Sequence, residues 1–79
     1  MNQFMRQELE GALKYYQDML NAQLKTIEFY RQQMTATTDP DIIASCMKSI
    51  NIVEKDFIPP IRQKIRELEY ELNLEALTN

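Results

Sequence analysis

Few side chains of this sequence could perform covalent chemistry. The chain has one cysteine, Cys46, and no histidine, so Cys46, Ser45 and Ser49 lack the imidazole base that commonly activates such nucleophiles. The usual zinc and di-metal ligand sets also need histidine, and a single glycine is too few for a glycine-rich phosphate loop. We therefore expect no catalytic residue, no cofactor and no metal.

Arg31 is the strongest candidate for binding a small anion. At 100° per residue it lies about 40° from Leu9, within the apolar stripe of the first predicted helix. One long helix followed by two shorter ones is expected for this chain, as set out below. These element lengths resemble those of the helical-type chorismate mutases, intertwined dimers that bind a dicarboxylate with several basic side chains in a buried pocket. No motif of that family occurs in this chain. A dimeric all-helical enzyme that binds a small anionic substrate is therefore an alternative interpretation.

The segment 62–75, "RQKIRELEYELNLE", places basic residues before acidic ones. The helix macrodipole favours the reverse order, so local helix stability does not explain why Arg62 and Arg66 precede Glu71 and Glu75. Two antiparallel copies of the segment would place these arginines opposite the glutamates of the other chain, which is the self-complementarity of a twofold dimer. A solvated helix face is the simpler interpretation.

The same charges could instead pair within one chain. If two helices form a hairpin whose turn is centred near residue 38, Arg66 lies opposite Glu10 and Arg6 lies opposite Glu71. This arrangement and the antiparallel pairing of two copies both remain open from the sequence.

Glu67, Glu71 and Glu75 recur every four residues and form an acidic stripe. Such a stripe could imitate a phosphate backbone, so an acidic nucleic-acid-mimicking inhibitor is a second alternative. A plain solubility face is the more common meaning, because neighbouring basic residues dilute the negative field. The net charge is −3 and no strongly basic face emerges, so we expect no binding to nucleic acid.

A second face of the first predicted helix carries small and aromatic residues, roughly 120–160° from its main stripe. Gly11 costs about 1 kcal/mol relative to alanine in a helix interior, so a reason for it is worth seeking. Gly11 and Ala22 would let another helix approach closely while aromatic side chains frame the contact. With the charged segment, the candidate protein interface comprises Phe4, Gly11, Tyr15, Ala22, Phe29, Arg62, Arg66, Glu71 and Glu75.

The elements that position these residues are all helical. Helix formers dominate, glycine occurs once, and strand-like alternation is missing. The first helix is expected at about 2–34, followed by a turn at 35–39. Asp39 is a good N-cap and Pro40 suits the first position of the next helix. The main stripe of the first helix consists of Leu9, Leu13, Tyr16, Leu20, Leu24, Ile27 and Met34.

The second arm is expected to be helical at about 40–57, kinked at 57–60 and helical again at about 60–77. Its apolar stripe keeps one phase across Pro59-Pro60, and no capping residue precedes Pro59. The prolines remove two backbone donors and clash with the preceding turn, so we expect a bend within one arm. The stripe comprises Ile43, Met47, Ile50, Phe57, Ile61, Ile65, Leu68, Leu72 and Ala76.

The sequence thus predicts one all-α domain, 1–79, in which a long antiparallel hairpin dimerises into a four-helix bundle. A chain of 79 residues without a disulfide buries a small core, so it needs a second copy or another protein to complete it. We expect a non-enzymatic interaction module: an adaptor, chaperone or inhibitor that acts through exposed helix faces. One unpaired cysteine is typical of a reducing compartment, so we expect a cytoplasmic protein. The charged N-terminus predicts no signal peptide, and the short apolar runs predict no membrane contact.

Overall fold

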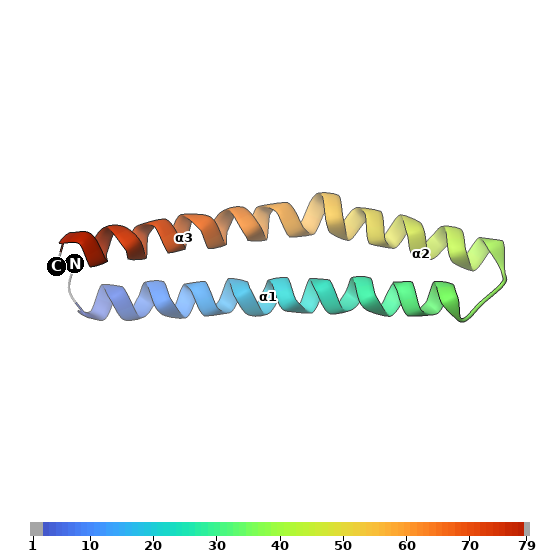
Figure 1. Cartoon of the computed structure of the whole chain (residues 1–79), viewed down its shortest axis with the longest axis horizontal. Helices are drawn as coiled ribbons and strands as arrows, with labels where there is room; N and C mark the ends of the chain where they lie inside the picture. Colours follow the sequence, from blue (N-terminus) through green and yellow to red (C-terminus); the bar gives the residue numbers. More distant parts are fainter. Residues whose placement is uncertain (1–2, 79) are drawn as a thin grey trace.

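The computed structural model describes residues 3–78, in which every regular element is helical. Helix α1 spans Gln3–Thr35, and a short loop leads to α2 at Pro40–Ile52. A π-helical turn, η1, at Val53–Phe57 joins α2 directly to α3 at Ile58–Thr78. The arm formed by α2, η1 and α3 runs antiparallel to α1 (Figure 1). The predicted all-α hairpin with a kinked second arm is confirmed.

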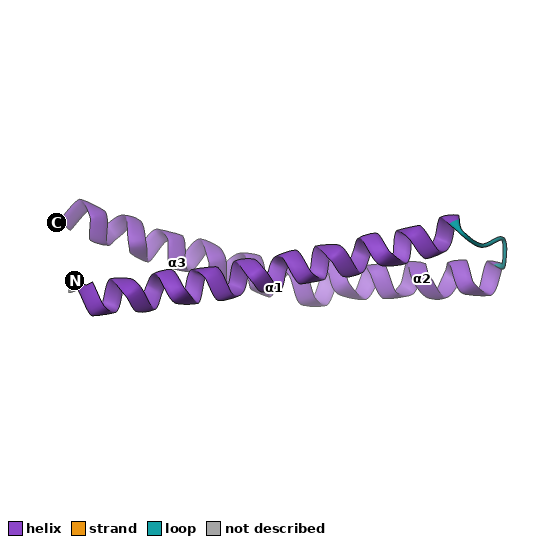
Figure 2. Cartoon of the chain, turned by 90° about the horizontal axis from the view of Figure 1, so that it is seen from below, coloured by secondary structure: helices purple, strands orange, loops and turns teal. Residues whose placement is uncertain are grey.

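The hairpin is long and thin. Its principal extents are 58 × 16 × 14 Å and its radius of gyration is 17.6 Å, whereas a compact chain of this length has a radius of about 12 Å. The two arms cross at a shallow angle near the middle of the molecule (Figure 2). The protein is therefore a single layer of two helices, and the outward half of each arm faces solvent. Among the described residues, no helix is long and apolar enough to cross a membrane.

The main stripe of α1 faces the second arm, with one exception. Leu24 was predicted in this stripe but is 42% exposed. It lies roughly 60° from Ile27 around the helix, at the edge that a single opposing helix leaves uncovered. The other members are buried or half-buried: Leu9, Leu13, Tyr16, Leu20, Ile27 and Met34.

The start of α2 follows its predicted capping signals. The Oδ1 of Asp39 accepts a hydrogen bond from the backbone N–H of Asp41 at 2.9 Å, and Pro40 occupies the first helical position. The carbonyl of Asp39 accepts the first helical bond, from the N–H of Ile43 at 3.1 Å. Asp39 therefore satisfies a donor that the helix itself cannot pair.

Replacing Asp39 with alanine is expected to lower the free energy of unfolding by about 1 kcal/mol, because the N–H of Asp41 loses its acceptor. Urea denaturation followed by circular dichroism measures the change. Asp39→Asn is the matched control, since an asparagine oxygen caps nearly as well. Equal losses in both variants would show that the charge of Asp39, and not its capping bond, supports the turn.

The kink of the second arm is a π-helical turn that ends just before the two prolines. The N–H of Ile58 donates to the carbonyl of Val53, five residues earlier. Pro59 and Pro60 then lie in the first turn of α3, where a missing N–H costs little. The bend was predicted at 57–60 and lies at Val53–Phe57, because the wider turn ahead of the prolines gives their rings room.

The extra residue of η1 changes which side chains reach the core. Val53 and Ile58, five residues apart, are both buried. Phe57 was predicted in the apolar stripe but is 51% exposed. The prediction counted 100° per residue through the bend, and a π turn advances less per residue. Ile58 therefore takes the inward position that was assigned to Phe57.

The core between the arms is small. Ile27, Val53 and Ile58 form its centre, and Leu20 and Ile50 pack against them. No side chain among the described residues is completely buried. The hairpin therefore holds together along a narrow seam, whose buried residues are Ile27, Cys46, Val53, Ile58, Ile61 and Leu68.

Candidate functional site

The second face of α1 is open to solvent. We call Phe4, Gly11, Tyr15, Ala22 and Phe29 the α1 aromatic face; every member is exposed. Tyr15 is 60% and Phe29 is 55% exposed. A Cβ added at Gly11 would meet no atom within 4 Å, so nothing in the hairpin itself requires glycine there. The single chain thus leaves this face without a cover.

Two of the exposed rings are held by half-buried neighbours. The Tyr15 ring meets the Tyr16 ring edge-on, with centroids 5.2 Å apart and an interplanar angle of 83°. Phe29 contacts Tyr30 in the same way, at 5.6 Å and 68°. Edge-to-face contacts of this kind are favourable and restrict ring motion. The two aromatic side chains are therefore partly preorganised for contact with another surface.

The two long sides of the hairpin differ in character. On one side, which we call the charged side, Arg31 pairs with Glu54 across the arms at 3.5 Å. A hollow between the arms is lined by Leu20 of α1 and by Arg62 of α3. Leu20 and Arg31 lie about 20° apart around α1, so both features open on the same side.

On α1, the exposed rings lie away from both the charged side and the second arm, on what we call the aromatic side. Phe29 lies about 160° from Ile27 around α1, so the α1 aromatic face points away from the second arm. Phe57 is exposed on η1, one residue before Ile58, which shares the core with Ile27. Phe57 therefore lies near the level of Phe29 along the hairpin but on a different face.

The total exposed area also indicates that the single chain leaves an interaction surface uncovered. The chain of 9.4 kDa exposes 5993 Å², whereas a compact protein of that mass exposes about 5000 Å². The excess of about 1000 Å² is close to the roughly 800 Å² that one partner contributes to a standard protein interface. The hairpin has the surplus surface of one interface.

A third apolar surface lies on the outer side of α3 and was not predicted. Tyr70, Leu74 and Leu77 are all exposed, and their spacing of four and three residues places them on one face of the helix. Tyr70 is about 160° from the buried centre of α3, so these side chains point away from α1. This outer stripe could contact a protein that does not cover the aromatic side.

The charged segment of α3 does not pair with α1 as the hairpin arrangement predicted. Arg6 donates to Glu10 of its own helix at 3.2 Å, and Arg66 donates to Gln63 at 2.7 Å. Arg66 and Leu20 line the same hollow, so Arg66 lies nearer to Leu20 than to Glu10. The predicted pairs Arg66 with Glu10 and Arg6 with Glu71 are therefore wrong.

The register differs for a physical reason. The loop carries the chain outward beyond the end of α1 before α2 begins (Figure 1), and η1 adds one residue to the second arm. Both shift later residues of the second arm toward the loop end. Arg62, Arg66 and Glu71 are exposed, while the side chain of Glu75 lies outside the described part. Their pairing between two copies stays a prediction.

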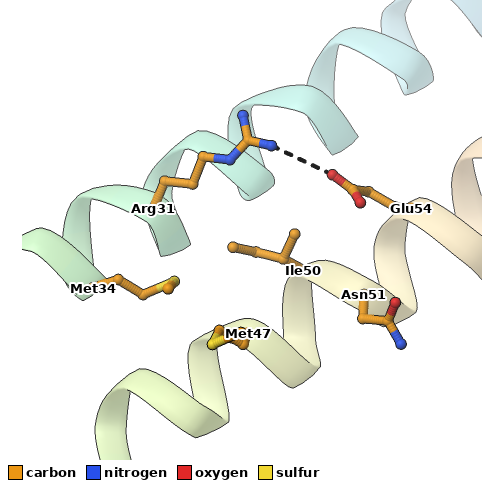
Figure 3. A pocket seen from close by; sticks show the side chains of 6 residues that line it. All are labelled: Arg31, Met34, Met47, Ile50, Asn51 and Glu54. Carbon is orange, nitrogen blue, oxygen red and sulfur yellow. Dashed lines mark hydrogen bonds and ion pairs between the residues drawn. The ribbon is translucent and has the colours of Figure 1, made fainter. Parts of the chain in front are cut away.

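Arg31 lines a shallow hollow of about 370 Å³ between the arms. The side chains of Met34, Met47 and Ile50 converge there from both arms, and the Arg31–Glu54 ion pair spans one end (Figure 3). Met47 was predicted in the apolar stripe and is exposed on the rim. Arg31 itself is exposed and its charge is already paired, so a small anion would compete with the Glu54 carboxylate for it.

The remaining reactive groups of the described residues do not converge on a site. Cys46 is buried and unpaired, and within residues 3–78 no three cysteine or carboxylate side chains converge as metal ligands. Neither alternative enzyme chemistry nor nucleic-acid mimicry gains support from this geometry. No family model, no curated protein and no solved structure matches the chain.

Proposed function

We propose that this protein is a small non-enzymatic interaction module that self-associates into a four-helix bundle and binds another protein through its remaining helix faces. The observation that carries the proposal is the surplus surface of about 1000 Å² on a one-layer hairpin. Several aromatic side chains of both arms are exposed, and aromatic residues dominate the energetics of protein interfaces.

The mechanism is burial of preformed helix faces. When a second hairpin covers the aromatic side, two layers replace one and α1 is packed on both its inner and its outer face. The outer stripe of Tyr70, Leu74 and Leu77 stays exposed in such a dimer. An amphipathic helix or an apolar groove of another protein would fit it, in the role of an adaptor, chaperone or inhibitor. The unpaired Cys46 is compatible with a reducing, cytoplasmic setting.

Solution mass and shape test the proposal. Light scattering coupled to small-angle X-ray scattering over a concentration series should give twice the chain mass of 9.4 kDa. Side-by-side pairing adds a layer without adding length, so the longest dimension should stay near 58 Å. Doubling the mass while nearly doubling the length would indicate end-to-end contact and would contradict the bundle.

A monomer at every concentration would reject self-association. Partner binding is tested separately, with immobilised wild-type protein and a Tyr70→Ser/Leu74→Ser variant. Proteins retained by the wild type and lost from the variant identify the outer stripe as a docking surface. If both surfaces prove inert in these two assays, the proposed function is wrong.

A further inference from the structure

The α1 aromatic face contains a regular repeat. Tyr15, Ala22 and Phe29 are spaced by seven residues, so they lie in line along the exposed helix. The order is large, small, large, and the small residue is central. Because Tyr15 and Phe29 are equidistant from Ala22, a second helix that runs in the opposite direction presents the same order of large, small and large residues.

We propose that two hairpins pack with their α1 helices antiparallel, with the twofold axis at Ala22. Tyr15 then contacts Phe29 of the partner subunit, and Phe29 contacts Tyr15 of the partner subunit. The two Ala22 side chains face each other across the axis and allow close approach of the helices. This arrangement specifies the dimer of the proposed function and rests on it.

Charges beside the stripe are complementary in this register. Asp18 and Lys25 are exposed and lie on the same flank of the line through Tyr15, Ala22 and Phe29. About an axis at Ala22, Asp18 falls opposite Lys25 of the partner subunit. Asp18 already pairs with Lys14 at 3.0 Å, so its carboxylate is oriented toward this flank. The symmetry produces two such contacts, one at each side of the axis.

A second register is conceivable and is less favourable. Centring the axis between residues 16 and 17 places Phe4 opposite Phe29 of the partner subunit, and Gly11 opposite Ala22 of the partner subunit. Tyr15 then falls opposite Asp18 of the partner subunit, so an aromatic ring meets a carboxylate instead of a ring. The axis at Ala22 instead pairs ring with ring and places Asp18 opposite Lys25 of the partner subunit.

Disulfide trapping tests the register directly. In the full chain carrying Cys46→Ala, Ala22→Cys should form an intersubunit disulfide under oxidised glutathione, so that most of the protein runs at twice the chain mass on a non-reducing gel. A disulfide needs Cα atoms within about 7 Å, which this geometry provides only near the axis. Reduction should restore the monomer band.

Gly11→Cys in the same background is the matched control, because its two copies would lie about 33 Å apart along antiparallel helices. Little trapping is expected for it. If the mass measurement gives a dimer but Ala22→Cys is not trapped, this register is wrong and the proposed self-association stands. Cross-linking only in a mixture of the Gly11→Cys and Ala22→Cys variants would assign the second register instead. A monomeric mass would reject both the register and the proposed dimer.

Discussion

Replacing Ile27 with alanine is expected to lower the free energy of unfolding by about 2–4 kcal/mol, the range for a buried isoleucine truncated to alanine. Ile27 is 5% exposed and occupies the centre of the core with Val53 and Ile58. A protein of this length has a total stability of about 4–12 kcal/mol, so the loss is a large share. Urea denaturation at fixed protein concentration, followed by circular dichroism, measures it.

Leu24→Ala is the matched control for this prediction. Leu24 belongs to the same predicted stripe and lies one turn before Ile27, but it is 42% exposed. Removing its side chain should cost less than about 1 kcal/mol, because less surface leaves a buried environment and little cavity forms. Equal losses in the two variants would place the core of the hairpin elsewhere, or would show that a second chain covers Leu24.

The contrast between Ile27 and Leu24, two positions of the main stripe of α1, shows what periodicity can predict. The spacing of apolar residues fixes which face of α1 is inward, and Ile27 and Leu20 lie inward as expected. It does not fix how wide the covered strip is. A single opposing helix covers a narrower strip than a multi-helix core would, so Leu24 at the edge stays exposed.

That the second arm is one bent helix could be predicted, but which of its side chains face α1 after the bend could not. Pro59-Pro60 required a bend, and the absence of a capping residue favoured one continuous arm. The sequence does not specify whether the chain relieves the proline clash by a kink or by a π turn. The choice decides whether Phe57 or Ile58 is inward, and the structure selects Ile58. One extra residue in the turn therefore makes Ile58 buried and Phe57 exposed, the reverse of the prediction for Phe57.

Some of the candidate interaction surfaces could be identified from the sequence and others could not. Tyr15 and Phe29 could be identified because they lie far from the main stripe of α1. The four- and three-residue spacing of the outer stripe, which includes Tyr70 and Leu74, could have indicated an apolar face. The charged residues between its members make this part of α3 resemble an ordinary solvent-exposed face. Cross-arm charge pairing could not be predicted, because it depends on the path of the loop and on the extra residue in η1.

The double substitution Tyr15→Ala/Phe29→Ala is expected to raise the dimer dissociation constant at least about 100-fold. Truncating one aromatic anchor costs on the order of 2 kcal/mol, and a symmetric dimer contains four of these side chains. Both side chains are more than half exposed in the single hairpin, so the helical content should be unchanged. Sedimentation equilibrium measures the constant, and circular dichroism checks the helices.

Tyr70→Ala/Leu74→Ala provides the comparison, because these side chains are also exposed but lie on the outer side of α3. The dissociation constant of this variant should stay within about threefold of wild type, as for residues outside an interface. If the outer-stripe variant dissociates and the Tyr15/Phe29 variant does not, the dimer forms through α3. The antiparallel charge pairing of Arg62 and Arg66 with the partner's glutamates would then become the favoured arrangement, and the aromatic side of α1 would be left for a different protein.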